Sequence, residues 1–159
     1  MKKRILIVDD EEIVVRSCQR ILSGDEFDID SAGNGLEAMA KIAENDYDML
    51  ILDIMMPKMN GIEVLQRVKE THPDIDVIMI TGLNEIETAV KAMKLGAFDY
   101  LPKPFDPEEL EMVVARALER RQLLQENVHL KNEVSARYSF ENIIGSSPPM
   151  QNVFRLVAR

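Results

Sequence analysis

Short apolar runs alternate along the chain with segments in which apolar residues recur every three or four positions. Continuous runs at 5–8, 49–52 and 77–80 are typical of strands that are buried on both faces of a sheet. The run at 27–30 alternates apolar and acidic residues, which predicts a strand nearer an edge. A shorter run at 98–101 predicts a fifth strand.

The intervening segments have the spacing of helices. Apolar residues recur there at Ile13, Val14, Cys18, Ile21 and Leu22, at Leu36, Met39, Ala40 and Ala43, at Ile62, Leu65 and Val68, and at Ile86, Ala89, Val90 and Met93. Because strand-to-strand crossovers are right-handed, alternating strands and helices place helices on both faces of a parallel sheet. The pattern predicts an α/β fold, a doubly wound five-stranded parallel sheet of the flavodoxin-like type, with an extended C-terminal helix.

The residues just after four of the predicted strands carry a charge or a hydroxyl group. Asp9 and Asp10 follow the first strand, Asp53 the third, Thr81 the fourth and Lys103 the fifth. Taken singly, each has a structural explanation as a helix cap, a turn residue or a solvated charge. Sites in such sheets form outside the carboxyl ends of the strands, so we expect all five residues to converge on that edge.

Three carboxylates packed together repel one another, and the arrangement is tolerable mainly when a cation lies among them. Oxygen ligands in a half-open site suit Mg²⁺, which keeps several waters and accepts phosphate oxygens. A lysine and a threonine hydroxyl nearby would hold an anion, so the set predicts phosphoryl transfer. Asp53, at the end of the central strand, is the predicted nucleophile and would form an acyl phosphate.

Four motifs make the sequence recognisable. They are ILIVDD at 5–10, LDIMMP at 52–57 with Gly61, TG at 81–82 and DYLPKPF at 99–105. Together they resemble the response-regulator receiver domain of two-component signalling, over residues 1 to about 120. The resemblance implies that Asp53 accepts a phosphoryl group from a phosphohistidine on a sensor histidine kinase, in a Mg²⁺-dependent step.

The same resemblance implies roles for the other site residues. Asp10, Asp53 and the backbone carbonyl of Met55 would hold Mg²⁺, with Asp9 helping through water. Lys103 would pair with the phosphoryl oxygens.

A conformational switch is also implied by the resemblance. Thr81 would move to the phosphoryl group, and the ring of Tyr100 would turn into the vacated space. By itself, Tyr100 is also explained as a strand aromatic that packs on a helix. The bond between Lys103 and Pro104 is expected to be cis, and the surface that changes would comprise the fourth helix, the fifth strand and the fifth helix.

The predicted fifth helix is unusually long. Asp106 and Pro107 form a strong helix start, and no Gly or Pro recurs before Gly145, so we expect the helix to run to about Val134. Two apolar seams compete along it, one at Leu110, Val114, Ala117, Leu124 and Val128, the other at Leu123, Asn127, Leu130 and Val134. We interpret the second part as a parallel homodimer linker. A solvated amphipathic extension is the alternative, because two heptads are few for a coiled coil.

The last residues introduce a second resemblance. The segment FENIIGSSPPM at 140–150 is similar to the opening of the AAA+ ATPase domain of sigma-54-dependent, NtrC-type activators. We therefore expect a receiver at 1–120, a helical dimerisation linker at 121–137 and the truncated start of the ATPase domain at 138–159. With no GxxxxGK phosphate loop, this fragment is expected not to be an ATPase enzyme. In the longer protein, the AAA+ domain, sigma-54 RNA polymerase and DNA would be partners.

Composition limits the remaining classes of function. The 19 Lys and Arg residues against 28 Asp and Glu residues give a net charge of −9, which argues against direct contact of this fragment with nucleic acid. No apolar run approaches the length of a membrane span, so a soluble cytoplasmic protein is expected. Cys18 is predicted to be core, and Met55, Met56 and Met59 are interpreted as an apolar docking surface for the kinase.

Three other kinds of protein share a sheet of this type. A haloacid-dehalogenase-type phosphatase would need a second acid two residues after its nucleophile, where this chain has Met55. A flavodoxin would need a hydroxyl- and glycine-rich phosphate loop where acids occupy 9–12. A receiver-shaped scaffold that is never phosphorylated is opposed by the intact set of acids, threonine and lysine.

Overall fold

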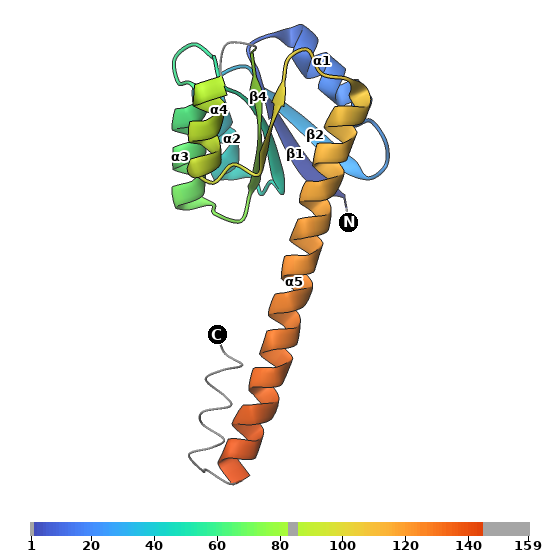
Figure 1. Ribbon diagram of the computed structural model, residues 1–159, viewed down its shortest axis with the longest axis vertical. Coiled ribbons are helices and arrows are strands. Elements are labelled where there is room, and N and C mark those ends of the chain that lie inside the picture. Colours follow the sequence, from blue (N-terminus) through green and yellow to red (C-terminus); the bar gives the residue numbers. More distant parts are fainter. Residues whose placement is uncertain (1, 83–85, 145–159) are drawn as a thin grey trace. The chain divides into compact units, whose positions relative to one another are not determined.

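The computed structural model describes residues 2–82 and 86–144, with side chains as far as residue 127. Strands and helices alternate through this part of the chain (Figure 1). The strands are β1 (Lys3–Val8), β2 (Phe27–Ala32), β3 (Met49–Asp53), β4 (Asp76–Thr81) and β5 (Asp99–Pro102). The helices are α1 (Glu12–Ile21), α2 (Gly35–Glu44), α3 (Gly61–Thr71), α4 (Ile86–Lys94) and α5 (Pro107–Ile144).

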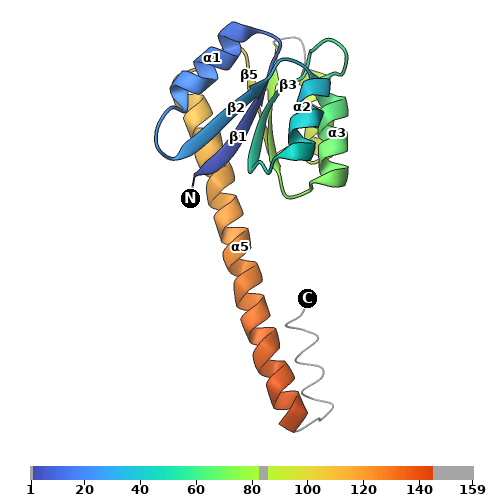
Figure 2. The same ribbon diagram turned by 180° about the vertical axis from the view of Figure 1, so that it is seen from behind.

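The strands form one parallel sheet in the order β2-β1-β3-β4-β5. Helices α1 and the first part of α5 cover one face, and α2, α3 and α4 cover the other (Figures 1 and 2). The predicted doubly wound, flavodoxin-like fold is confirmed, and the alternating strand β2 lies at an edge as expected.

The core follows from the two-residue period of the strands. Leu6, Val8, Leu50 and Leu52 point to the face with α2, α3 and α4, where they join the main apolar cluster. Their neighbours along β1 and β3 point to the opposite face and are equally buried. Both faces of the central strands are therefore covered, which explains why their sequences are continuously apolar.

On two helices, the residues with helical apolar spacing are not all buried. On α4, Ala89 and Ala92 are buried, whereas Ile86 and Val90, which share the spacing of Ala89, are 70% and 48% exposed. On α2, Leu36 is likewise exposed, and the buried residues are Gly35, Ala38 and Ile42. Gly and Ala at most of these buried positions let each helix approach the structure beneath it closely.

Helix α1 buries apolar side chains near its C-terminal end but not in its first turn. Cys18 and Leu22 are buried, which confirms the core position of the cysteine, but Ile13 is 80% exposed. Ile13 lies in the first turn of α1, next to the carboxyl end of β1, and so shares the helical spacing of Cys18 without its burial.

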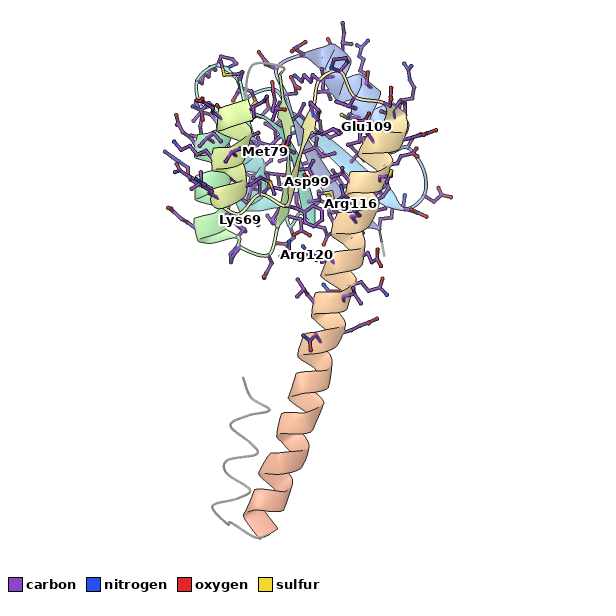
Figure 3. The ribbon with its side chains drawn as sticks, viewed as in Figure 1. Lys69, Met79, Asp99, Glu109, Arg116 and Arg120 are labelled. Carbon is purple, nitrogen blue, oxygen red and sulfur yellow. The ribbon has the colours of Figure 1, made fainter. Side chains whose placement is uncertain are left out.

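Helix α5 continues past its predicted end at Val134 to Ile144. The chain divides into two compact units, Met1–Ala117 and Leu118–Arg159, and this boundary lies within α5. In the first unit, Arg116 of α5 donates to Asp99 of β5 at 2.8 Å (Figure 3). In the second, Leu123 and Leu124 are 58% and 52% exposed.

Parts of the tail prediction fall beyond the described structure. The side chains of Val128, Leu130 and Val134 lie outside the described residues, as does the segment 145–159, which holds half of the ATPase-like motif. The other half continues α5 as helix. Within the described part of the chain, no helix combines the length and apolarity needed to cross a membrane.

Hydrogen bonds to Asp30 join the edge strand β2 to α2 and to Tyr47, which precedes β3. The buried Tyr47 donates its hydroxyl to Asp30 at 2.7 Å, and Lys41 of α2 donates to the same carboxylate at 3.0 Å. Burial and the bond to Asp30 raise the pKa of Tyr47 to about 12. Burial alone would raise the pKa of Asp30, but the bonds from Tyr47 and Lys41 outweigh it and lower that pKa.

Removing the Tyr47 hydroxyl tests this network. We expect Tyr47→Phe to lower the free energy of unfolding by about 1 kcal/mol, because Asp30 loses a buried donor. The exposed Tyr100→Phe serves as the control and should change it by less than about 0.5 kcal/mol. Urea unfolding followed by circular dichroism measures both, and equal effects would contradict the network's importance.

Candidate functional site

Three aspartates meet at the carboxyl edge of the sheet. Asp53 is the last residue of β3, and Asp9 and Asp10 follow β1, which pairs with β3 in the register Val8 to Leu52. Each offers a carboxylate oxygen within 4.8 Å of the others. Asp9 and Asp53 are buried and Asp10 is exposed, so the cluster has a solvent-facing side.

Asp10 does not act as a helix cap, which was its alternative explanation. The N-cap of α1 is Glu11, whose own side chain makes no capping hydrogen bond, and the side chain that accepts from the Glu11 N–H is that of Asp9, at 2.8 Å. Beside the cluster, a cavity of about 180 Å³ is lined by Asp9 and Asp10, by Glu12 and Val15 of α1 and by residues 31–33 at the end of β2, whereas Asp53 does not line it. The acids therefore combine close spacing with an open approach, which fits a hydrated divalent cation such as Mg²⁺.

Lys103 supplies positive charge to the two buried acids. Its Nζ lies 3.2 Å from Asp9 Oδ2 and 3.5 Å from Asp53 Oδ1. The lysine is placed by its backbone, because its N–H donates to the carbonyl of Thr81 at 2.7 Å and extends the β4–β5 pairing. The peptide bond that follows, Lys103–Pro104, is cis as expected.

The electrostatics show that one lysine does not fully compensate the acids. Burial, followed by the charge of Asp9, raises the pKa of Asp53 to about 7. Burial likewise raises the pKa of Asp9, despite its bonds to the Glu11 N–H and to Lys103. Burial alone would lower the pKa of Lys103, but the charges of Asp53 and Asp9 outweigh it and raise that pKa.

Thr81 and Tyr100 lie on the neighbouring strands β4 and β5. Thr81 is buried at the end of β4, on the same sheet edge as Asp53. Tyr100 pairs in register with Met79 and is 42% exposed. Thr81 is therefore placed at the edge where an anion on Asp53 would lie, whereas Tyr100 is set back along β5.

The loop from β3 to α3 is closed tightly around Asp53. The N–H of Gly61 donates to the Ile54 carbonyl at 2.8 Å, and a Cβ at Gly61 would lie 2.2 Å from the Asp53 carbonyl oxygen. Only glycine permits this approach. Met55 is 63% exposed on the loop, but Met59 is buried, so the predicted surface of three methionines is wrong at Met59.

Sequence reasoning missed one residue of the site. Glu11 places Oε1 3.4 Å from Lys103 Nζ, so the lysine bridges an exposed acid as well as the two buried ones. Its position directly after Asp9 and Asp10 was the available signal. The contact itself joins residues 92 apart in sequence and required the fold.

The burial of Asp53 predicts a pH dependence of stability in the absence of divalent cations. Its folded pKa of about 7 exceeds the ordinary value of 3.8, so the folded chain holds the proton more tightly than the unfolded chain. The resulting stabilisation is complete below about pH 4 and is lost as the pH rises through about 7. Asp53→Asn cannot ionise and should be more stable than the parent at pH 8 by roughly 1–3 kcal/mol.

Thermal unfolding in EDTA between pH 5 and pH 8 measures this difference, which should shrink toward pH 5. Asp25→Asn, at an exposed aspartate, is the matched control and should leave the pH profile unchanged. A constant difference between Asp53→Asn and the parent across the range would contradict the raised pKa.

Comparisons with known proteins agree with this geometry. The chain is 37% identical to the regulatory protein AtoC of Escherichia coli over 98% of its own length and 34% of AtoC. It is also 37% identical to the DNA-binding transcriptional regulator NtrC of Escherichia coli, over 98% of its length and 32% of NtrC. The chain thus spans about a third of the length of these relatives.

Solved structures give the same picture. NtrX from Brucella abortus, in a complex with ADP, matches 98% of this chain and 33% of its own at a TM-score of 0.77 and 32% identity. A receiver domain protein from Clostridium thermocellum matches 77% of this chain and 98% of its own at a TM-score of 0.72 and 33% identity. Residues 5–115 match the response regulator receiver domain family. The chain belongs to the response regulator receiver domains and is related to the NtrC-type activators.

Proposed function

We propose that this chain accepts a phosphoryl group on Asp53 from a phosphohistidine of a sensor histidine kinase. The observation that carries the proposal is a buried carboxylate at the end of the central strand, 3.5 Å from Lys103 and within 4.8 Å of two further acids. Phosphoryl transfer needs this combination of a placed oxygen nucleophile and compensating charge.

The donor set fits Mg²⁺ in the proposed site. Asp10, Asp53 and the carbonyl of Met55 would hold the ion, with Asp9 acting through water. Its charge would favour the ionised form of Asp53 and neutralise phosphoryl oxygens. Asp53, with a pKa of about 7 in the chain alone, gains most from that help because only the ionised carboxylate is nucleophilic.

The chemical step is a displacement at phosphorus. A carboxylate oxygen of Asp53 attacks, the phosphorus–nitrogen bond breaks, and the histidine nitrogen leaves with its electron pair and takes up a proton. The product is an acyl phosphate on Asp53. Lys103 and the hydroxyl of Thr81 would hold the phosphoryl oxygens. Because the phosphoryl group stays on Asp53, the chain acts as a phosphoryl acceptor rather than as an enzyme that turns over a free substrate.

The acyl phosphate would then act as a switch. It adds about −1.5 to −2 charges and new acceptor oxygens beside an acidic cluster. A conformation in which Thr81 donates to these oxygens becomes more populated, and Tyr100 turns inward behind it. The affected surface comprises α4, β5 and α5.

The tail carries the proposed output. We assign residues 1–120 to the receiver, 121–137 to a dimerisation linker and 138–159 to the opening of an AAA+ domain. Support comes from the exposed Leu123 and Leu124 on α5 and from the similarity to NtrC and AtoC over nearly the whole chain. In a longer protein, phosphorylation would control a sigma-54 activator ATPase and, through it, sigma-54 RNA polymerase at DNA. A cytoplasmic location remains a prediction.

Phosphoryl acceptance can be tested with a small phosphodonor such as a phosphoramidate. We expect the parent chain to form an acyl phosphate in the presence of Mg²⁺ but not in EDTA, and this phosphate should hydrolyse with time at neutral pH. The Asp53→Asn variant should form none. Lys103→Ala should slow its formation by roughly 10²-fold or more, because the phosphoryl charge loses its fixed cation. Phosphate gel shifts or intact-mass spectrometry measure the product.

Asp25→Asn is the control and should be phosphorylated like the parent. Label that persists in Asp53→Asn would contradict the assignment. Release of phosphate from a phosphomonoester would instead favour the phosphatase alternative, and a bound yellow chromophore the flavodoxin alternative.

The linker proposal is tested by solution mass. Light scattering should show a dimer whose population or shape changes with Mg²⁺ and beryllofluoride, a mimic of the phosphoryl group, and does not change in Asp53→Asn. Leu123→Glu should weaken dimerisation at least about tenfold, because it places charge in an apolar contact. The neighbouring Gln125→Glu adds the same charge at an exposed polar position and should not. A monomer under all conditions would refute the dimer linker.

A further inference from the structure

The start of α2 touches the loop that would carry a metal ligand. Figure 2 shows α2 beside α3, the helix into which that loop leads. A Cβ at Gly35, the first residue of α2, would lie 2.7 Å from both the Cβ and the carbonyl oxygen of Met59. It would also lie 2.9 Å from Cγ2 of Val64 on α3. The absence of a side chain at Gly35 is therefore what allows this contact.

The same helix end is anchored to the segment of Asp9. The N–H of Asp9 donates to the carbonyl of Ala32 at 3.1 Å, immediately before the turn into α2. Within the turn, Asn34 accepts from the N–H of Glu37 at 2.9 Å, and the carboxylate of Glu37 accepts from the N–H of Gly33 at 3.0 Å. This reciprocal cap holds the first turn of α2 in one position relative to the sheet edge.

Met59 lies between its contact with Gly35 and the rest of the loop. Its side chain is 5% exposed within the core, and its N–H donates to the carbonyl of Pro57 at 2.9 Å. Lys58, between them, has a φ of 70°, so this turn is sharp. The hydrogen bond from the Gly61 N–H to the Ile54 carbonyl joins the two ends of the loop that contains Met55. Because the loop is closed in this way, a displacement of Met59 would also move Met55.

We propose that Gly35 is a positioning residue that sets the place of the Met55 carbonyl, and hence the Mg²⁺ affinity, through its contact with Met59. The inference rests on the proposed function, since it concerns the same metal site. Gly35 supplies no ligand; it lets α2 support the loop from one side while the sheet supports Asp9 on the other. Loss of a group that hydrogen-bonds directly to a metal ligand weakens metal affinity roughly 10- to 100-fold, and Gly35, which acts through Met59, is expected at the lower end of that range.

The test is the Mg²⁺ affinity of Gly35→Ala. Thermal unfolding over a Mg²⁺ titration gives the dissociation constant from the metal-dependent increment in stability, separately from the stability of the metal-free chain. We expect the dissociation constant to rise roughly tenfold. Met59→Ala removes the buried anchor without crowding α2 and should shift it in the same direction, so it decides the question if Gly35→Ala does not fold.

Two controls separate positioning from general destabilisation. Gly24→Ala lies in the turn before β2, away from the carboxyl edge of the sheet, where a Cβ would meet nothing within 4 Å but the φ of 153° strains the backbone. Val68→Ala removes buried volume from α3 away from the loop and should lower stability. Both should keep the parent's Mg²⁺ affinity.

The outcomes distinguish the two proposals. A parent chain that shows no Mg²⁺-dependent stabilisation, or shows it equally in Asp53→Asn and Asp10→Asn, would refute the proposed metal site itself. Normal binding by the parent together with dissociation constants for Gly35→Ala and Met59→Ala within about twofold of both controls would overturn the role of Gly35 alone. A selective rise in those two variants supports it.

Discussion

The carboxyl edge of the parallel sheet holds three carboxylates and one lysine, Lys103, so negative charge exceeds positive charge there. Parallel pairing brings the carboxyl ends of β1 and β3 together, so Asp9 and Asp53 are buried side by side, with Asp10 at their open side. Lys103 contacts both buried acids, yet burial still raises the pKa of each. A divalent cation would relieve this repulsion, and a phosphoryl group would then add charge where cations are concentrated.

The scaffold places these groups mainly through the backbone. Asp53 ends a strand that is buried over its whole length, and Lys103 is held by a bond from its own N–H to the neighbouring strand. Close glycine contacts at Gly35 and Gly61 then shape the one loop that joins the site to α3. Precise placement of this kind suits phosphoryl transfer, where positioning and charge neutralisation supply most of the catalysis.

The candidate site and the long helix α5 lie close together along the chain. Helix α5 begins soon after Lys103, contributes Leu110 and Val114 to the receiver core, and continues through the boundary between the two units. In the proposed switch, a change at β5 and α5 would therefore reach the proposed linker within one helix. The chain covers about a third of the length of NtrC and AtoC, so the consequence for an ATPase belongs to the proposed function of a longer protein.

The sequence by itself determined the order of strands and helices, the sheet and the residues at its carboxyl edge, because these depend on local periodicity and on chain topology. Only the tertiary structure decided which apolar residues of α4 are buried, since close approach placed Ala89 and Ala92 inward and left the larger Ile86 exposed. It also decided the ion pair of Lys103 with Glu11 and the contact of Gly35 with Met59. Those contacts join distant segments, and their distances arise only when the whole sheet and its helices have packed.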